Sequence, residues 1–119
     1  MKFEKGKMEF PLYRDGKLLS RKTVEGLRYG PVFVHNQSTH VWVVSHYASG
    51  LRFAVTSDRS MAKEIAKEAA RRFEGLLSIE DAKALKRDRR FERFKKWSRA
   101  FWDHNPAPGV TMTWNGKRK

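Results

Sequence analysis

The chain of 119 residues contains no cysteine and no long apolar stretch. Without cysteine it can form neither disulfide bonds nor a thiolate metal site. A membrane-spanning helix needs about 18 or more apolar residues in a row. The charged residues 1–7 also lack the apolar centre of a secretion signal. We therefore expect a cytoplasmic protein without a membrane partner.

Signatures of catalysis are also missing. Neither of the glycine-rich motifs that cradle phosphates, G-x-G-x-x-G and G-x-x-x-x-G-K-[ST], occurs in the chain. A metal site usually takes three protein ligands, and the histidines His35, His40 and His46 have no carboxylate in the same segment. His40 and His46 remain the candidates for the acid–base pair of a metal-independent nuclease. We expect a protein that is not an enzyme and that needs no cofactor and no metal.

Acidic residues are scarce. The chain has 13 Asp and Glu against 26 Lys and Arg, which gives a net charge of +13. So much charge of one sign opposes compaction unless an acidic partner neutralises it. Nucleic acid is the leading partner, because a strongly basic domain is its usual electrostatic footprint, and both DNA and RNA remain open. An acidic protein surface is the alternative, which would make the chain an inhibitor or adaptor.

The composition otherwise indicates one folded domain. Aromatic residues make up 13% of the chain, whereas disordered chains are poor in them. We predict an α+β domain over residues 1–109, in which an N-terminal β-hairpin and a three-stranded antiparallel sheet packed on one helix are followed by a long basic helix. The expected ranges are 8–25 for the hairpin, 32–57 for the sheet, 60–74 for the first helix, 78–103 for the basic helix and 110–119 for a short basic tail.

Turn residues place the predicted strands. Asp15-Gly16 lies between two apolar runs and favours a type I′ hairpin. Ala48-Ser49-Gly50 favours a three-residue turn that pairs Val43 with Val55 and Ser45 with Phe53. A two-residue turn would shift this pairing by one residue. In the favoured register the core face carries Val41, Val43, Tyr47, Leu51, Phe53 and Val55, and the outer face carries His40, Trp42, Val44, His46, Arg52 and Thr56.

The second predicted helix carries most of the excess charge. Residues 83–99 contain nine basic and two acidic residues, a net charge of +7. The aromatic residues of this helix recur in steps of three and four and can dock it on the core. Its Lys and Arg side chains then face outward, where they can engage phosphates, although a purely solvated face is the alternative. The expected nucleic-acid contacts on this helix are Lys83, Lys86, Arg87, Arg89, Arg90, Arg93, Lys96 and Arg99.

The outer face of the predicted sheet offers a second contact surface. Trp42 shares that face with Arg52, and an aromatic ring there could stack on an unpaired base. Residues 31–73, three strands followed by one amphipathic helix, resemble in architecture the arm-site-binding domains of tyrosine recombinases and the related AP2-type domains, although no motif is shared. The resemblance implies a sheet face that enters the major groove, with Trp42, Val44 and Arg52 among its contacts.

A small, basic, cysteine-free chain of this kind also suits an accessory protein of a virus or mobile element. We expect such a protein either to bind nucleic acid, with little dependence on sequence, or to inhibit an enzyme that processes it.

Overall fold

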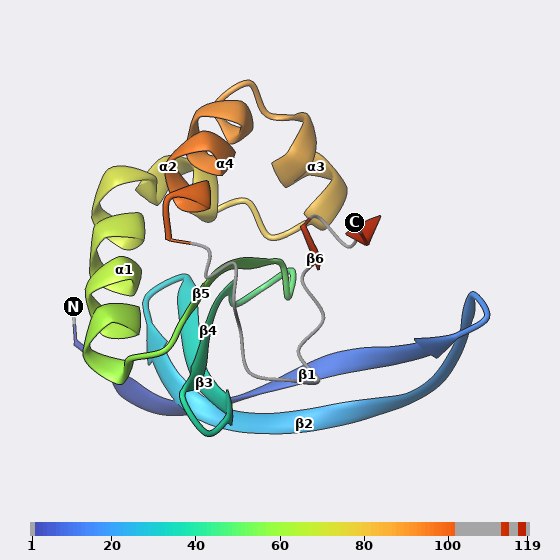
Figure 1. The fold of residues 1–119 in the computed structure, drawn as a ribbon. Helices are drawn as coiled ribbons and strands as arrows, with labels where there is room; N and C mark the ends of the chain where they lie inside the picture. Colours follow the sequence, from blue (N-terminus) through green and yellow to red (C-terminus); the bar gives the residue numbers. More distant parts are fainter. Residues whose placement is uncertain (1, 102–112, 115–116, 119) are drawn as a thin grey trace.

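A five-stranded antiparallel sheet with the strand order β1-β2-β3-β4-β5 forms the centre of the protein, and helices cover it (Figure 1). The computed structural model describes residues 2–101, 113–114 and 117–118, and the fold is α+β. The strands of the large sheet are β1 (Glu4–Arg14), β2 (Lys17–Tyr29), β3 (Val32–Ser38), β4 (Val41–His46) and β5 (Arg52–Thr56). The helices are α1 (Arg59–Arg72), α2 (Glu74–Leu77), α3 (Ala82–Arg87) and α4 (Phe91–Arg99).

The predicted hairpin forms, but it belongs to the main sheet. Asp15 and Gly16 have φ values of 52° and 78°, as the type I′ turn requires. β2 then continues to Tyr29 and pairs with β3, with Leu27 opposite Val34. The expectation of a separate three-stranded sheet is therefore wrong.

Gly26 explains why β2 can continue into the sheet. This glycine follows the predicted end of the hairpin at residue 25, and it lies where β2 meets β3. A Cβ atom at Gly26 would overlap the carbonyl oxygen of Val34 and would lie 2.8 Å from the ring of Phe33. Glycine is needed here because the neighbouring strand approaches so closely.

The sheet curls, so that β1 comes close to the turn between β4 and β5. The Tyr47 hydroxyl donates a hydrogen bond of 3.2 Å to the Lys7 carbonyl oxygen. Met8 and Phe10 pack on Phe33 in a small core of their own. One face of the middle strands is buried inside this curl, and the other face packs on α1. No open sheet face of the kind implied by the AP2-type resemblance is present in the described part of the chain.

The predicted register of β4 and β5 is right at one end and wrong at the other. Val43 pairs with Val55 as expected, but Ser45 pairs with Arg52 instead of Phe53. The amide of His46 donates to the carbonyl of Leu51, which leaves a four-residue loop and a bulge in the ladder. The bulge moves Phe53 to the helix side of the sheet and Arg52 to the opposite side.

Helix α1 begins one residue and ends two residues before the predicted bounds. The Asp58 carboxylate caps it by accepting from the Met61 amide at 3.2 Å. Met61, in the first turn of the helix, is 49% exposed. The buried stripe consists mostly of alanine, which lets the helix backbone lie close to the sheet, and its members are Ala62, Ile65, Ala66, Ala69 and Ala70.

The long basic helix expected over 78–103 is replaced by two shorter helices, α3 and α4. In one continuous helix, Leu85 and Phe94 would lie nine residues apart and so point in opposite directions, about 180° from each other. Both side chains are fully buried in the same core, which requires a break between them. Asp88 provides the break: its backbone is extended, and its carboxylate accepts from the Arg90 amide at 2.9 Å.

The predicted basic tail contributes one short pair of strands. β6 (Thr113–Trp114) pairs with β7 (Lys117–Arg118) in an antiparallel manner. The other residues of the 110–119 range, and the end of the predicted basic helix at 102–103, lie outside the described residues.

Replacing Gly26 by alanine should destabilise the protein by about 1–3 kcal/mol, because a methyl group there overlaps the β3 backbone. The matched control is Gly6→Ala on the opposite strand, where the added Cβ meets its nearest neighbours at 3.5 and 3.7 Å. Urea unfolding of both variants measures the difference. Equal stabilities would show that the contact between Gly26 and β3 is not tight.

Candidate nucleic-acid interface

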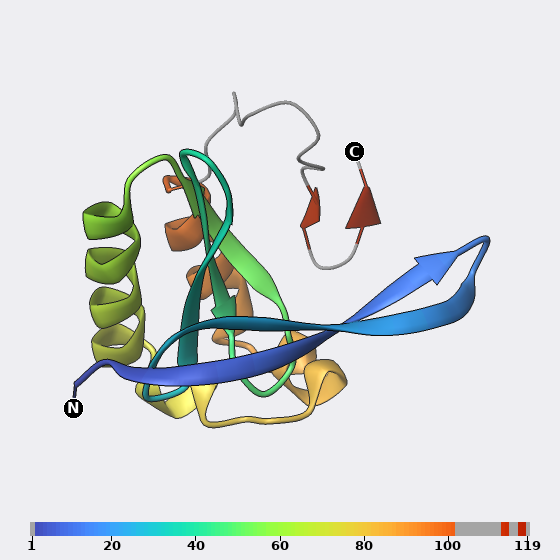
Figure 2. The same cartoon turned by 90° about the horizontal axis from the view of Figure 1, so that it is seen from below.

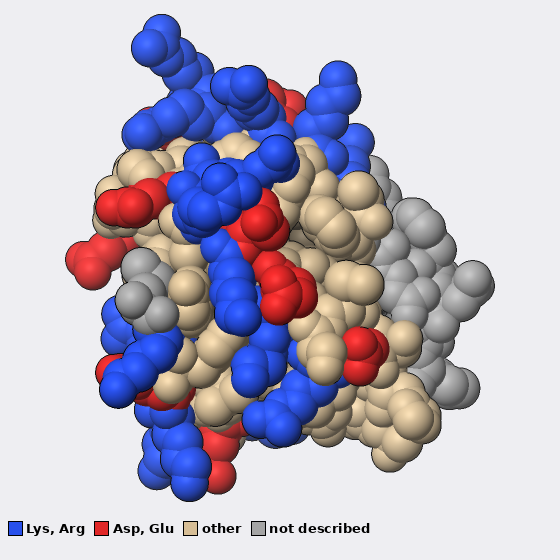
Figure 3. Space-filling view, turned by 90° about the vertical axis from the view of Figure 1, so that its left-hand side faces the viewer, with Lys and Arg blue, Asp and Glu red and all other residues tan. Residues whose placement is uncertain are grey.

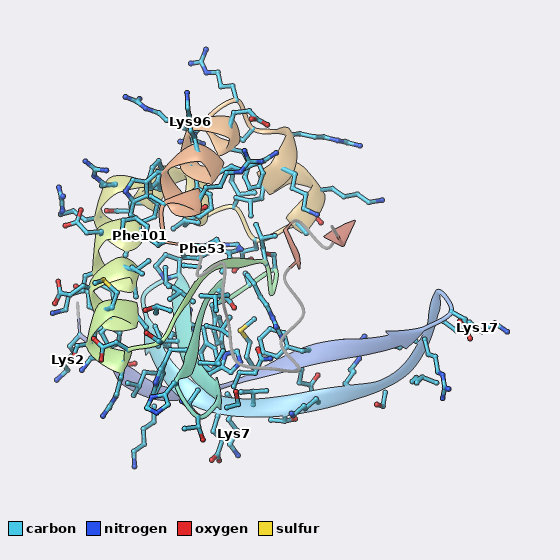
Figure 4. The ribbon with its side chains drawn as sticks, in the orientation of Figure 1. Lys2, Lys7, Lys17, Phe53, Lys96 and Phe101 are labelled. Atoms are coloured by element: carbon cyan, nitrogen blue, oxygen red, sulfur yellow. The ribbon has the colours of Figure 1, made fainter. Side chains whose placement is uncertain are left out.

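An aromatic cluster fixes how α4 lies on the body of the protein. Phe94 is fully buried, and the centroid of its ring lies 4.9 Å from that of Phe53 on β5 and 5.1 Å from that of Phe73 at the end of α1. Trp97 is half-buried, and its ring centroid lies 5.3 Å from that of Phe73 and 5.0 Å from that of Phe101. These aromatic residues therefore dock the helix on the core, and the remaining side of α4 faces solvent (Figure 4).

The solvent-facing side of α3 and α4 is strongly basic. Lys96 extends outward from α4 (Figure 4). Figure 3 shows Lys and Arg gathered along the upper edge of the molecule, whereas acidic and basic side chains are mixed lower on the same face. We call this surface the basic cap; its exposed members are Lys83, Lys86, Arg87, Arg89, Arg90, Arg93, Lys96 and Arg99.

The two acidic residues of this segment are already engaged by close neighbours. Both carboxylate oxygens of Asp88 accept from the Arg90 guanidinium, at 2.8 and 2.9 Å. These hydrogen bonds lower the pKa of Asp88 to about 2. Glu92 lies 3.8 Å from Lys95. Within residues 2–101, six cap residues form no salt bridge: Lys83, Arg87, Arg89, Arg93, Lys96 and Arg99.

A pocket of about 410 Å³ opens where α1, α2 and α4 meet. Arg90 and Arg93 line it together with Arg72 from the last turn of α1. Gly75 forms part of the wall, and a Cβ atom there would lie 2.7 Å from Nη1 of Arg90. We call this site the arginine pocket. Three arginines, two of them predicted as contacts, line one cavity, and arginine is a residue type suited to binding an anion.

Sequence reasoning missed Arg72, because its spacing to Glu68 fits an ordinary surface ion pair. That pair exists, with Nε of Arg72 3.6 Å from the carboxylate of Glu68. The position of Arg72 could have indicated its role. It is the last residue of its helix and precedes Phe73, which packs on α4.

Trp42 and Arg52 lie on opposite faces of the sheet. Arg52 points into the curl, where its guanidinium donates to Gln37 at 3.0 Å and lies 5.4 Å from the Phe10 ring. Trp42 lies on the α1 side and is half-buried against the main core, with Arg59 5.9 Å from its ring. The predicted platform that combines the two residues is therefore not formed.

Trp42 instead lines a groove of about 570 Å³ beside the beginning of α1. Lys5, Lys7 and Arg59 contribute positive charge to this groove, and Glu25 lies 4.0 Å from Lys7. Val44, the third expected contact on the sheet, is fully buried.

The structure keeps the two candidate nuclease histidines apart. His40 is exposed in the turn before β4, while His46 ends that strand, roughly 20 Å away along an extended chain. His46 is fully buried between Ser49, 2.7 Å from Nδ1, and the Leu77 carbonyl, 2.8 Å from Nε2. It therefore joins the β4–β5 turn to α2, and it cannot reach an external substrate in this structure.

Comparisons of the chain with known protein families, with curated proteins and with solved structures found no match. None of the described helices combines the length and the apolar character that a membrane crossing requires. In the described segments, no three His, Asp or Glu side chains are grouped to hold a metal ion.

The buried His35 should make stability depend on pH. Burial, reinforced by Arg52 and Lys22, lowers its pKa from 6.5 to about 4. Between these values the unfolded chain takes up a proton that the folded protein does not. The free energy of unfolding should therefore fall as the pH is lowered from 6.5 to 4, by up to about 1.4 kcal/mol per pH unit from this residue.

Urea unfolding of wild type and His35→Leu at pH 7.5 and pH 5 tests this expectation. The loss of stability between the two pH values should be smaller in the variant by up to about 2 kcal/mol. Equal losses in both proteins would contradict the lowered pKa.

Proposed function

We propose that this protein binds nucleic acid, with little dependence on sequence, through the basic cap. The observation that carries the proposal is the set of six exposed Lys and Arg side chains that form no salt bridge within residues 2–101. A folded protein needs no such imbalance for solubility, because mixed charges serve that purpose. A polyanion would relieve the repulsion among these side chains.

The geometry of α4 supports contact with a phosphate backbone. Arg93 and Lys96 lie three residues apart in α4, so their side chains share one side of the helix, and Arg89 lies in the turn just before it. Lys and Arg contacts with phosphates release condensed counterions and supply most of sequence-independent affinity. Such contacts fix the orientation of the protein and carry no information about bases.

The arginine pocket supplies a fixed point within the basic cap. Asp88 holds the Arg90 guanidinium at two atoms, and the absence of a side chain at Gly75 leaves room for it. Arg93 and Arg72 complete the pocket. A phosphate placed there would meet a preorganised guanidinium, so less side-chain entropy is lost on binding.

Neutralising two cap charges should weaken binding and its salt dependence. Arg89→Gln/Arg93→Gln removes two phosphate contacts, so the slope of log K against log salt should become less steep by about two. Fluorescence anisotropy with labelled DNA and RNA, from about 50 mM salt upward, measures this change.

The matched control is Lys67→Gln/Arg71→Gln on α1. It removes the same charge from an exposed helix, but its two cations are already paired with Glu64 and Glu68. If both double variants weaken binding equally, net charge alone is responsible and the basic cap is not the contact surface. If wild type binds neither DNA nor RNA at about 50 mM salt, the proposal is wrong, and an acidic protein becomes the partner to search for.

A further inference from the structure

The β1–β2 ribbon extends well beyond the body of the protein (Figures 1 and 2). β2 pairs with β3 only over residues 27–29, and Phe10 and Val24 pack on the small second core around Phe33. Residues 11–22 continue as a two-stranded arm that ends in the tight Asp15-Gly16 turn, with Lys17 at its tip (Figure 4). From Phe10 to the tip, five residues give a reach of roughly 16 Å.

The arm carries the features of a contact surface. Leu18 and Leu19 are large apolar side chains, yet they are 47% and 63% exposed. Residues 14–22 contain four basic residues and one acidic residue, a net charge of +3. The basic residues are exposed and have no acidic partner among the described residues; they are Arg14, Lys17, Arg21 and Lys22.

The arm projects from the body, is positively charged and carries apolar residues near its tip, and these features together fit the major groove of a duplex. The major groove of a duplex is about 12 Å wide and 8.5 Å deep and admits a two-stranded ribbon, whereas the minor groove of B-form DNA is only about 6 Å wide. Two strands lie about 4.8 Å apart, so the arm with its side chains fits the wider groove. Phosphates border the groove on both sides, and thymine methyl groups offer apolar contacts within it.

We propose that the β1–β2 arm enters the major groove of duplex DNA. Arg14, Lys17, Arg21 and Lys22 face the phosphates at its edges, and Leu18 and Leu19 contact base edges. The proposal rests on the nucleic-acid binding proposed above and names duplex DNA as its form. An apolar pocket of a protein is the competing occupant, and the charge of the arm disfavours it unless that protein is acidic.

A single fluorophore on the arm tests the insertion directly. Because the chain has no cysteine, Ser20→Cys creates one labelling site at an exposed position. The emission of an environment-sensitive label there should change when duplex DNA is added. The change should disappear with DNA whose cytosines carry glucosyl groups in the major groove, and it should persist when netropsin fills the minor groove.

Point variants provide an independent measurement. Leu18→Ser/Leu19→Ser should weaken duplex binding about tenfold, because two apolar contacts are lost. Met61→Ser is the matched control: it removes another exposed apolar side chain, on α1, and should leave affinity unchanged. Both variants alter exposed positions, and their thermal unfolding should match wild type.

The outcomes separate the two proposals. The major-groove insertion is wrong if anisotropy reports binding while the emission of the arm label does not change. It is also wrong if netropsin, and not glucosylation, abolishes the emission change. In both cases the basic cap proposal stands. Equal affinity of the leucine variant and wild type would also overturn the insertion. If wild type binds no nucleic acid at about 50 mM salt, both proposals fail together.

Discussion

The burial of Phe94 between Phe53 and Phe73 is the contact on which the arrangement of the molecule depends. It joins three elements that are distant in the chain: the last strand of the sheet, the end of α1 and the helix α4. Because this side of α4 is committed to aromatic contacts, its basic residues have only the solvent side available. The same packing brings Arg72 next to Arg90 and Arg93. A hydrophobic contact thus determines where the charge is displayed.

A second constraint acts at the other end of the molecule. The absence of a side chain at Gly26 lets β2 join β3 while the rest of the ribbon turns away. Phe33 fills the space beside the glycine, and Met8 and Phe10 pack on Phe33. This small second core holds the base of the ribbon, so the arm beyond it is presented in a defined direction. The basic cap and the arm therefore lie in separate parts of the molecule (Figure 1).

Local signals in the sequence predicted local structure well. The Asp15-Gly16 turn, the pairing of Val43 with Val55 and the approximate extent of α1 are all present. Each depends on residues that are neighbours in the chain or lie across a short turn. The predictions that failed depend on distant contacts. To predict that β2 pairs with β3, one must know that the β3 backbone comes close to Gly26. To predict the break at Asp88, one must know that Leu85 and Phe94 are buried in the same core.

The sequence by itself determined the excess of positive charge, the α+β character of the chain and the segment in which Lys and Arg concentrate. These properties follow from the composition and from the spacing of apolar and charged residues along the chain. The tertiary structure alone decided that Trp42 and Arg52 face opposite ways, because one bulged residue in β5 reverses the direction of the side chains beyond it. It also decided that Arg72 belongs to the basic cap's pocket, and that the hairpin stands out as an arm. Those outcomes depend on how strands and helices meet in space, which short-range patterns along a single chain do not encode.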